Sequence, residues 1–579
     1  MERRYAAAGR DVDAPPETGF VTPGRAGAGV LALAIGVWAA LFASGRWGRS
    51  DPAEVLEWLV PAACAASMLG AAVAGIACRA EIWSAARAPG KRAWLLIGAA
   101  VAMALFARLA LVPATERLYY DEHTYLQLAR GIAAEGRASV ASYGVLRNGI
   151  YHCEIGSYSH WSLGWPTALA AGFRLTGVAR WTGRAMNLVL SLSSAILVAL
   201  VAALLFPGAR VCVAAAAIYA CLPANQIWSR TSVSEVFAAF AAILAVMSAA
   251  LFARSPNRRL GWLLAVSAAL AAEARNETIL LLPVCALMVL ALGGRKPLAA
   301  AVRPGIAAVV LLWPQAAHLG YISRSYDANQ VAGSGFSIGY VPGNLASVVQ
   351  YLRGEPLLLA AIVLAVIGTS HARMGGSAWP LWAWLVGALL APMVHFGGSY
   401  AFPGGERFAL AWLPALSLAA ACGLYAFHHS IAPHLPRWLP AAGWSLLYVA
   451  VLWTAGSHAV REDLKMAVPR RDLAFLRESL RSIPRDGVVV SSDPPAVIAE
   501  GHSTVFLTWA GAEADRLNRL AREHAGKLYY FESPSSSPRQ WPDGPACHQR
   551  VMSFFRAEPV ARESSPDGVR VLYRLRNPG

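Results

Sequence analysis

The stretch that decides the fold is short and acidic, and it reads Leu118-Tyr119-Tyr120-Asp121-Glu122-His123-Thr124-Tyr125. It follows directly on an apolar run over residues 93–112, so two adjacent carboxylates stand just past the end of a predicted membrane span. Apolar side chains then recur on one helical face over residues 125–132, until Gly136 ends the pattern. The pattern predicts an amphipathic helix that lies along the membrane surface with the acid pair at its N-terminus.

The composition indicates a polytopic membrane protein. Of the 579 residues 56% are hydrophobic and 15% are charged, and the mean hydropathy is +0.44. Apolar residues gather in blocks of about 20 with almost no charge, as membrane-spanning helices require. About thirteen such blocks lie near 28–44, 56–78, 93–113, 185–206, 210–228, 232–253, 260–274, 277–293, 304–320, 355–370, 378–396, 408–427 and 438–456.

The formal net charge of +16 is explained by the loops between these spans. Arginine and lysine cluster in the loops at 79–92, 254–259 and 295–303, and counting spans places all three on the side of the N-terminus. The positive-inside rule makes that side the cytoplasm, so the acid pair faces outward. No basic stripe with interleaved aromatic residues is present, and we predict no nucleic-acid binding. Heavy use of alanine, arginine and glycine favours the inner (cytoplasmic) membrane of a GC-rich bacterium.

Changes in composition divide the chain into three predicted parts. Residues 1–27 form a disordered cytoplasmic tail, residues 28–456 a transmembrane domain, and residues 457–579 an extracytoplasmic domain in which strands alternate with helices. The transmembrane domain has two long outer loops, 114–184 with the acid pair and 321–355, which is predicted to be mobile. The fold class is thus an all-α polytopic membrane protein with a small C-terminal α/β domain.

The acid pair is the first candidate for chemistry. A carboxylate at the boundary of lipid and water can act as a general base on a hydroxyl group. The alternative is that Asp121 only caps the helix and interacts with its positive end. The long outer loop and the flanking aromatic residues favour the first interpretation, with Asp121 as base, Glu122 as its neighbour or a sugar contact, and Tyr120 and Tyr125 as substrate contacts. No cofactor is required, although the two carboxylates could hold a divalent ion.

Arginines at the outer ends of spans form the second candidate group. They are Arg230, Arg275, Arg324 and Arg407. Each by itself can be an interfacial side chain or a member of a local ion pair, but together they can bind a phosphate, because guanidinium groups bind it through paired hydrogen bonds. Glu235 begins a span and needs a partner, for which Arg230 or Arg275 is predicted. Glu235 is also a candidate substrate contact.

The first outer loop contains two further candidates, His160 and Trp165, within Ser159-His160-Trp161-Ser162-Leu163-Gly164-Trp165-Pro166. Pro166 suits a first helical turn, and apolar residues at a spacing of four predict a second surface helix over 165–173. Each candidate either contacts substrate or has a local role, Trp165 as an interfacial anchor and His160 as a locally satisfied side chain. The eight cysteines show no metal-ligand spacing, and a disulfide between Cys153 and Cys547 has only weak support.

Several motifs resemble, in order, those of the GT-C membrane glycosyltransferases, in the branch of protein O-mannosyltransferases and lipid A aminoarabinose transferases. The resemblance extends over residues 93 to 425 and rests on Tyr120–Leu126, Leu163–Pro166, Ser234-Glu235, Arg275-Asn276-Glu277 and Glu406-Arg407-Phe408. It implies a sugar donor on a polyprenyl monophosphate, transfer on the outer face and inversion at the anomeric carbon. It also implies that Asp121 is the catalytic acidic residue of the first loop and that Arg407 binds the donor phosphate, with Arg275 or Arg230 beside it.

Three functions are compatible with these patterns. The first is a glycosyltransferase that acts on a hydroxyl acceptor, which is a lipid, glycan or protein of the cell envelope. The second is a transporter or flippase, but charges gather at the outer ends of spans and no internal repeat is found. The third is a non-catalytic, membrane-anchored assembly protein whose C-terminal domain does the recognition. The first is favoured by the acid pair and the outer arginines together.

Overall fold

The computed structural model describes most of the chain between residues 52 and 577. The residues not described within this range are 113–115, 117–118, 148–149, 207, 294–297, 326–336, 371–377, 396, 401–403, 432–435, 437–452, 454–455, 458–459, 461–463, 465 and 541–542. The predicted tail at 1–27 and the predicted span at 28–44 lie outside the described residues, and so does almost all of the span at 438–456.

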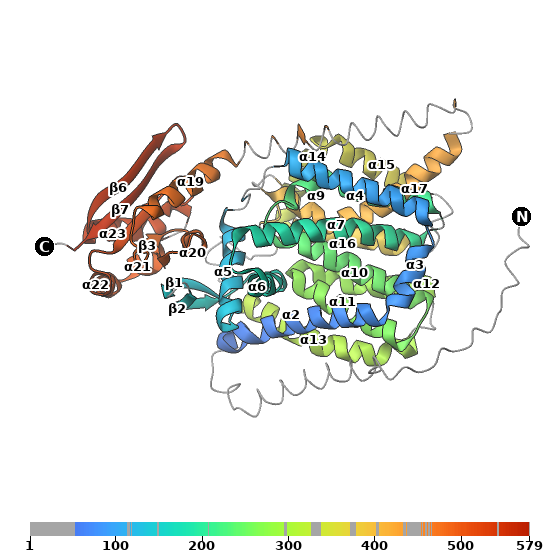
Figure 1. Cartoon of the computed structure of the whole chain (residues 1–579), viewed down its shortest axis with the longest axis horizontal. Helices are drawn as coiled ribbons and strands as arrows, with labels where there is room; N and C mark the ends of the chain where they lie inside the picture. The colour runs from blue at the N-terminus through green and yellow to red at the C-terminus, as the bar shows by residue number, and fades with distance from the viewer. Residues whose placement is uncertain are drawn as a thin grey trace, which may run out of the picture.

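Apolar helices packed side by side form the larger body of the molecule (Figure 1). Among the described residues, six helices are long and apolar enough to cross a membrane, or eight if each of two bent pairs counts as one span. The predicted membrane fold is confirmed, whereas the count of about thirteen spans is not. The helices of this body are α2 (Pro52–Ala77), α3 (Arg79–Arg87), α4 (Lys91–Leu111), α7 (Arg180–Leu205), α8 (Ala209–Cys221), α9 (Pro223–Trp228), α10 (Ser234–Arg254), α11 (Arg258–Ala274), η2 (Asn276–Leu280), α12 (Leu281–Gly293), α13 (Leu298–Ser325), η4 (Ile338–Tyr340), α14 (Val341–Arg353), α15 (Pro356–Ser370), α16 (Ala378–Met393), η6 (Gly405–Ala411) and α17 (Leu413–Ile431).

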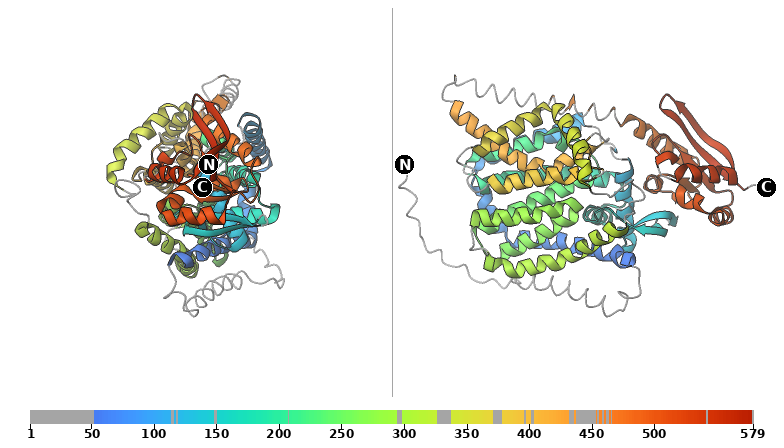
Figure 2. Two further views of the ribbon diagram at one scale, coloured as in Figure 1. Left: turned by 90° about the vertical axis from the view of Figure 1, so that its left-hand side faces the viewer. Right: turned by 180° about the vertical axis from the view of Figure 1, so that it is seen from behind.

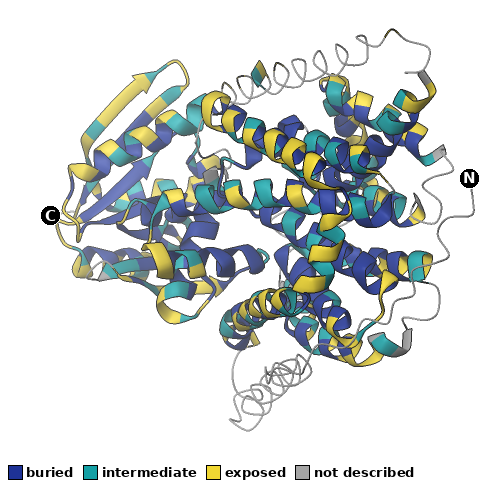
Figure 3. Cartoon of the chain, turned by 45° about the vertical axis from the view of Figure 1, so that its right-hand side comes forward, coloured by how far each residue is buried: buried dark blue, intermediate teal, exposed yellow. Residues whose placement is uncertain are grey.

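Buried residues gather in the interior of the helix bundle, and exposed residues lie along its outer helices (Figure 3). Helix α10 is apolar on every side and rich in alanine, and nearly all of its residues are buried, as expected for a helix enclosed by neighbours. Helices α4 and α13 instead expose large apolar side chains such as Leu95, Phe106 and Val309. Exposed apolar side chains on long helices are stable only in lipid, so these faces mark the outside of the bundle.

The acidic stretch forms helix α5 (Tyr119–Glu135), which crosses one end of the bundle at the side of the C-terminal domain (Figure 1). The helix ends as predicted, because Gly136 adopts a positive φ of 74°. It does not lie on an open surface, however, since every residue from Glu122 to Ala129 is buried. Its polar side is covered by the rest of the first outer loop and by the C-terminal domain. Helix α6 (Gly164–Thr176), the second predicted surface helix, packs beside it.

The C-terminal domain is built on a seven-stranded sheet that also takes in part of the first outer loop. Strands β1 (Ser139–Arg147) and β2 (Ile150–Tyr158) form an antiparallel hairpin, and Tyr143 of β1 pairs with Val505 of β4 (Ser503–Phe506). The other strands are β3 (Val488–Ser491), β5 (Leu528–Glu532), β6 (Arg556–Ser565) and β7 (Gly568–Arg576). The order of strands is β2-β1-β4-β3-β5-β7-β6, with β3 parallel to both β4 and β5. The α/β domain was predicted from the sequence, but the hairpin was not. A single sheet therefore joins the first outer loop, which carries Asp121, to the C-terminal domain.

The helices of the C-terminal domain pack around these strands (Figure 2). They are α19 (Ala467–Arg481), α20 (Pro494–Ala499), α21 (Leu507–Ala512), α22 (Ala514–Glu523), η8 (Pro538–Gln540) and α23 (Gly544–Phe554). Cys153 and Cys547 are both free thiols, so the suggested disulfide is absent.

The second predicted outer loop is more ordered than expected. Helix α13 continues to Ser325, and residues 338–353 form η4 and α14. The central part, 326–336, lies outside the described residues. Apolar residues of α14, such as Val348, pack into the bundle, which explains why this glycine- and serine-rich segment becomes helical.

Polar contacts fasten the C-terminal domain to α5 and to the first outer loop. On α5, Arg130 donates to the backbone carbonyls of Ile498 and Ala499, and His123 Nδ1 lies 3.9 Å from Asp493 Oδ2 in the buried interior. Before α5, Glu116 is bound by three arginines from both bodies, at 3.2 Å by Arg180, at 3.6 Å by Arg477 and more closely by Arg184.

This arginine cluster makes a pH-dependent contribution to stability. Burial would raise the pKa of Glu116, but the arginines, with Arg184 foremost, outweigh it and lower the pKa from 4.5 to about 2. The lowered pKa corresponds to a contribution on the order of 3 kcal/mol, which is complete above the ordinary pKa and is lost as the pH falls toward the folded-state pKa.

Replacing Glu116 with glutamine should remove this dependence. In thermal unfolding of the purified protein, native and Glu116→Gln chains should differ most near neutral pH, and the difference should shrink between about pH 5 and about pH 3. A difference that stays constant across this range would contradict the ion-pair assignment.

Candidate functional site

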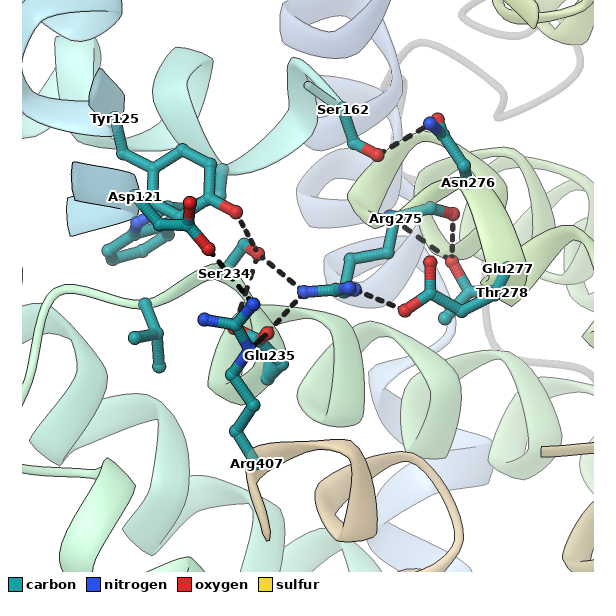
Figure 4. A network of polar contacts seen from close by, with 12 residues as sticks. Asp121, Tyr125, Ser162, Ser234, Glu235, Arg275, Asn276, Glu277, Thr278 and Arg407 are labelled. Atoms are coloured by element: carbon teal, nitrogen blue, oxygen red, sulfur yellow. Dashed lines mark hydrogen bonds and ion pairs between the residues drawn. The ribbon is translucent and has the colours of Figure 1, made fainter. Parts of the chain in front are cut away.

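Acidic and basic side chains from four elements meet at the end of the bundle that carries α5 (Figure 4). Asp121 stands in the first turn of α5, Glu235 in the first turn of α10, Arg275 at the end of α11, and Arg407 on η6. Four of the residues predicted from separate motifs are thereby brought into one network. We call these four residues the charged cluster.

Glu235 is the centre of the charged cluster. Its Oε1 lies 2.7 Å from Arg407 Nε and also pairs with Arg275 Nη1, while only 4% of its side chain is exposed. A carboxylate so deeply buried would be costly without cationic partners, and two guanidinium groups satisfy it here. The predicted pairing with Arg275 is confirmed, whereas the pairing with Arg230 is not observed.

Arg407 connects the buried carboxylate to the acid pair. Its Nη2 lies 2.9 Å from Asp121 Oδ2, and about a quarter of the Asp121 side chain, 24%, is exposed. Arg407 Nη1 is buried and has no hydrogen-bond partner among the residues that the structure describes. The ring of Phe408 lies 5.3 Å from the Arg407 guanidinium carbon, a cation–π distance. One donor of this guanidinium therefore remains available for an anion.

Arg275 is held by a second set of partners. It pairs with Glu277 as well as Glu235, and its Nη1 donates to the Ser234 hydroxyl at 3.2 Å. The Ser234 hydroxyl also lies 3.1 Å from the hydroxyl of Tyr125, a predicted substrate contact. Burial by itself would lower the pKa of Arg275, but Glu235 and Glu277 together raise it above its ordinary value. The guanidinium is therefore charged at any physiological pH.

Two glycines allow the elements of the site to approach closely. A Cβ atom on Gly164 at the start of α6 would lie 2.6 Å from the carbonyl oxygen of Glu273, two residues before Arg275. A Cβ on Gly405 would lie 2.5 Å from the Ser399 carbonyl oxygen, and the preceding Gly404 has a positive φ of 83°. The motifs around Gly164 and Gly405 thus contribute backbone contacts that no larger residue permits.

Aromatic residues border Asp121 on another side. The Tyr120 ring lies 5.8 Å from Trp161, and Trp161 stacks on His160 at 3.6 Å. Burial lowers the pKa of His160 to about 4, against the opposing effect of Asp121, so the imidazole is neutral at pH 7. These three residues form a mixed aromatic and hydrogen-bonding surface of the kind that can contact a sugar ring.

The other predicted site residues support the segment before α10 or lie elsewhere. Glu122 accepts from Ser232 N at 2.7 Å, and Trp165, which is fully buried, donates to Ser232 O at 2.7 Å. Trp165 is thus neither an interfacial anchor nor open to substrate in this conformation. Arg230 donates to the Val112 carbonyl at 3.3 Å, outside the charged cluster. The side chain of Arg324, the fourth predicted outer arginine, lies outside the described residues.

Asp121 and Glu122 do not form a shared set of metal ligands, because one contacts Arg407 and the other the Ser232 backbone. Within the described part of the chain, no group of three or more His, Cys, Asp or Glu side chains is placed to hold a metal ion.

Sequence reasoning did not identify Ser234, Phe408 or Trp161 as members of the site. Ser234 and Phe408 are the sequence neighbours of the predicted site residues Glu235 and Arg407, and this position could have identified them as candidates. Trp161 follows the predicted residue His160, but tryptophan is common at that depth in any membrane protein, so the sequence offered no specific signal for it.

Together, the helix bundle and the domain at its end define a polytopic membrane protein, and the solved structures that resemble it are GT-C glycosyltransferases. Neither a protein-family model nor a curated protein matches the sequence. Among solved structures, ArnT from Cupriavidus metallidurans in the apo state has a TM-score of 0.53 at 15% identity and covers 83% of this chain and 98% of its own. The same protein bound to undecaprenyl phosphate has a TM-score of 0.52 at 14% identity, covering 83% and 97%. At these identities the likeness establishes the fold, which confirms the resemblance at that level.

The charged cluster predicts an asymmetry between two glutamates that both bind Arg275. Glu235→Gln leaves Arg407 and Arg275 without their shared buried anion and should lower the free energy of unfolding by about 3 kcal/mol. Glu277→Gln is the matched control, because its side chain is 28% exposed and its loss should cost below about 1 kcal/mol. Denaturant unfolding in detergent measures both. Equal effects of the two substitutions would show that Glu235 is not the centre of the cluster.

Proposed function

We propose that this chain is an integral-membrane glycosyltransferase that moves a sugar from a polyprenyl-monophosphate donor to a hydroxyl acceptor of the cell envelope. The observation that carries the proposal is the pairing of a partly exposed Asp121 with Arg407, one of whose donors is unused, at the end of a membrane bundle. A solved protein of the same fold, ArnT, binds undecaprenyl phosphate, which supports a donor of this chemical class.

The ion pair between Asp121 and Arg407 suggests how donor binding prepares the base. A polyprenyl-linked sugar phosphate is a diester with one negative charge, and it competes with Asp121 for the Arg407 guanidinium. When the phosphate takes this position, Arg407 stays neutralised and the Asp121 carboxylate loses its cation. A carboxylate released from its cation is a stronger proton acceptor, so the base is activated only when donor is present.

The transfer step then needs little beyond positioning. The acceptor oxygen attacks the anomeric carbon as its proton passes to Asp121, and the bond from that carbon to the phosphate oxygen breaks. The products are the inverted glycoside and a polyprenyl phosphate monoester. Arg407 and Arg275 stabilise the negative charge that develops on the leaving phosphate. In this mechanism Asp121, the base, acts on the face of the sugar opposite the phosphate. Tyr120 and His160 are placed to orient the sugar.

The transfer is proposed to occur on the outer face of a bacterial inner membrane. The basic helix α3 lies at the opposite end of the bundle from α5 (Figure 1). By the positive-inside rule α3 then faces the cytoplasm, and α5 with the C-terminal domain faces outward. The transporter alternative is less favoured, because the charged cluster stands at span ends rather than at mid-membrane, although the bent pair η6–α17 is a feature that transporters share.

Replacement of Asp121 with asparagine tests the base. The substitution keeps the shape but removes the proton acceptor, so turnover of a radiolabelled polyprenyl-phosphate sugar should fall by roughly 100- to 10,000-fold. Donor binding should persist, because Arg407 and Arg275 remain. Glu523→Gln on the distant helix α22 is the control and should keep native turnover. Native turnover in Asp121→Asn would remove Asp121 from the mechanism.

Replacement of Arg407 with lysine tests the phosphate contact. Lysine keeps the positive charge but cannot donate two parallel hydrogen bonds from a planar guanidinium group. The KM for the lipid-linked sugar should therefore rise by roughly tenfold. The readout is the KM for the lipid-linked sugar at saturating acceptor. An unchanged KM would show that the donor phosphate binds elsewhere.

A further inference from the structure

A large cleft lies between the first outer loop and the C-terminal domain, at the far end of α5 from Asp121. Its volume is about 1140 Å³. Helix α5 lines it through Arg130, Ala133 and Ala134, the hairpin through Leu146, Ile150 and Tyr151, and the C-terminal domain through α19 and the segments that follow α19 and α20. Its size exceeds that of a typical small-molecule pocket, which suits an extended ligand.

The polar lining of the cleft carries an excess of positive charge. Five arginines line it, namely Arg130, Arg174, Arg477, Arg481 and Arg485, against two acidic residues, Asp486 and Glu500. Both acids already have cationic partners, since Asp486 pairs with Lys527 and Glu500 with Arg180 and Arg477. Arg477 is in turn held by Glu116 and Glu500, and Arg481 forms a weak, exposed pair with Glu478. The other three lining arginines have no carboxylate at ion-pair distance among the described residues, so the net charge of the lining is positive and favours an anion.

Two nitrogen atoms in the lining can form further hydrogen bonds. His502 is 8% exposed, and its Nδ1 has no hydrogen-bond partner among the described residues. Arg130 Nε is likewise buried and without a hydrogen-bond partner in the described part of the chain, although the terminal nitrogens of Arg130 bind backbone carbonyls. Arg130 can therefore donate to an anion through Nε, and His502 can form a hydrogen bond through Nδ1.

The cleft also has an apolar side, which lies next to exposed apolar side chains at the start of α7. Phe173 and Val178 line it, and α7 begins just after Val178 at Arg180. Around this entry point Leu175 is 87% exposed and Trp181 57% exposed, as residues at a lipid interface are. A ligand with an anionic headgroup and an acyl chain could place one in the cleft and the other in the membrane.

We propose that this cleft binds an anionic amphiphile, a lipid with a phosphate or carboxylate headgroup. Arg130 stands nine residues after Asp121 on α5, about 13 Å along the helix axis. The residues from Glu122 to Ala129 between them are buried, so the cleft is a site separate from the charged cluster.

The test measures binding of soluble short-chain lipids to the full-length protein in detergent. Dihexanoyl phosphatidic acid, dihexanoyl phosphatidylcholine and inorganic phosphate serve as probes, titrated by isothermal calorimetry. The phosphatidic acid should bind more tightly than the other two, because it alone has both the anion and the acyl chains. Equal affinity for inorganic phosphate would show a free-anion site and overturn the lipid assignment.

Two exposed arginines of the lining provide the variants. Arg481→Gln and Arg485→Gln should each weaken binding of phosphatidic acid by about twofold to fivefold, and the double variant by about tenfold. Arg519→Gln on α22 is the matched control, because Arg519 is also an exposed helical arginine but does not line the cleft. Thermal unfolding of each variant verifies that the fold is intact. Unchanged affinity in the double variant would overturn the proposal.

Asp121→Asn separates this inference from the proposed function. Its affinity for phosphatidic acid should equal that of the native chain, because Asp121 lies outside the cleft. Suppose that the native chain binds phosphatidic acid but does not turn over any lipid-linked sugar. That result would refute the proposed transferase function and would leave the cleft as an anionic-lipid site. Loss of binding in Asp121→Asn would overturn the cleft as a separate site.

Discussion

The site depends on one buried carboxylate that two guanidinium groups share. Glu235 begins the most enclosed helix of the bundle, and the cost of burying its charge is offset only when Arg275 and Arg407 both reach it. These arginines come from the end of α11 and from η6, so the ion pairs fix three elements relative to one another. Asp121 is connected to this network by its ion pair with Arg407. The position of its side chain therefore depends on the ion pairs of the bundle as well as on α5.

Local signals in the sequence were enough to predict the elements that carry this site. The apolar periodicity after Asp121 and the stop at Gly136 match α5, and the Pro166 motif matches α6. The cost of an unpaired Glu235 at a span end predicted Arg230 or Arg275 as its partner, and Arg275 is the one that pairs with it. The choice of Arg407 over Arg230 could not be made from spacing, because each stands at a predicted outer end. Only the fold shows that Arg230 contacts the Val112 carbonyl instead.

Long-range pairing was beyond what the sequence could predict. The hairpin β1–β2 lies in a segment rich in glycine and tyrosine, and its partner β4 is about 360 residues away. No local pattern specifies which distant strand a hairpin edge will join. The same reason explains why α5 was expected on an open membrane surface. Its polar residues His123 and Gln127 resemble a solvated face, yet they contact Asp493 of the C-terminal domain and Tyr151 of the hairpin.

The shared sheet has a consequence for how the protein is made. Residues 139–158 leave the ribosome long before residues 503–506, and at about 5 to 20 residues per second the wait is roughly 20 to 70 seconds. Throughout that interval the edge of β1 has no partner strand, and α5 lacks its cover. The loop that bears Asp121 is completed only after nearly the whole polypeptide has been translated. A chain that has been translated only as far as the last helices of the bundle therefore lacks the strand that completes this outer loop.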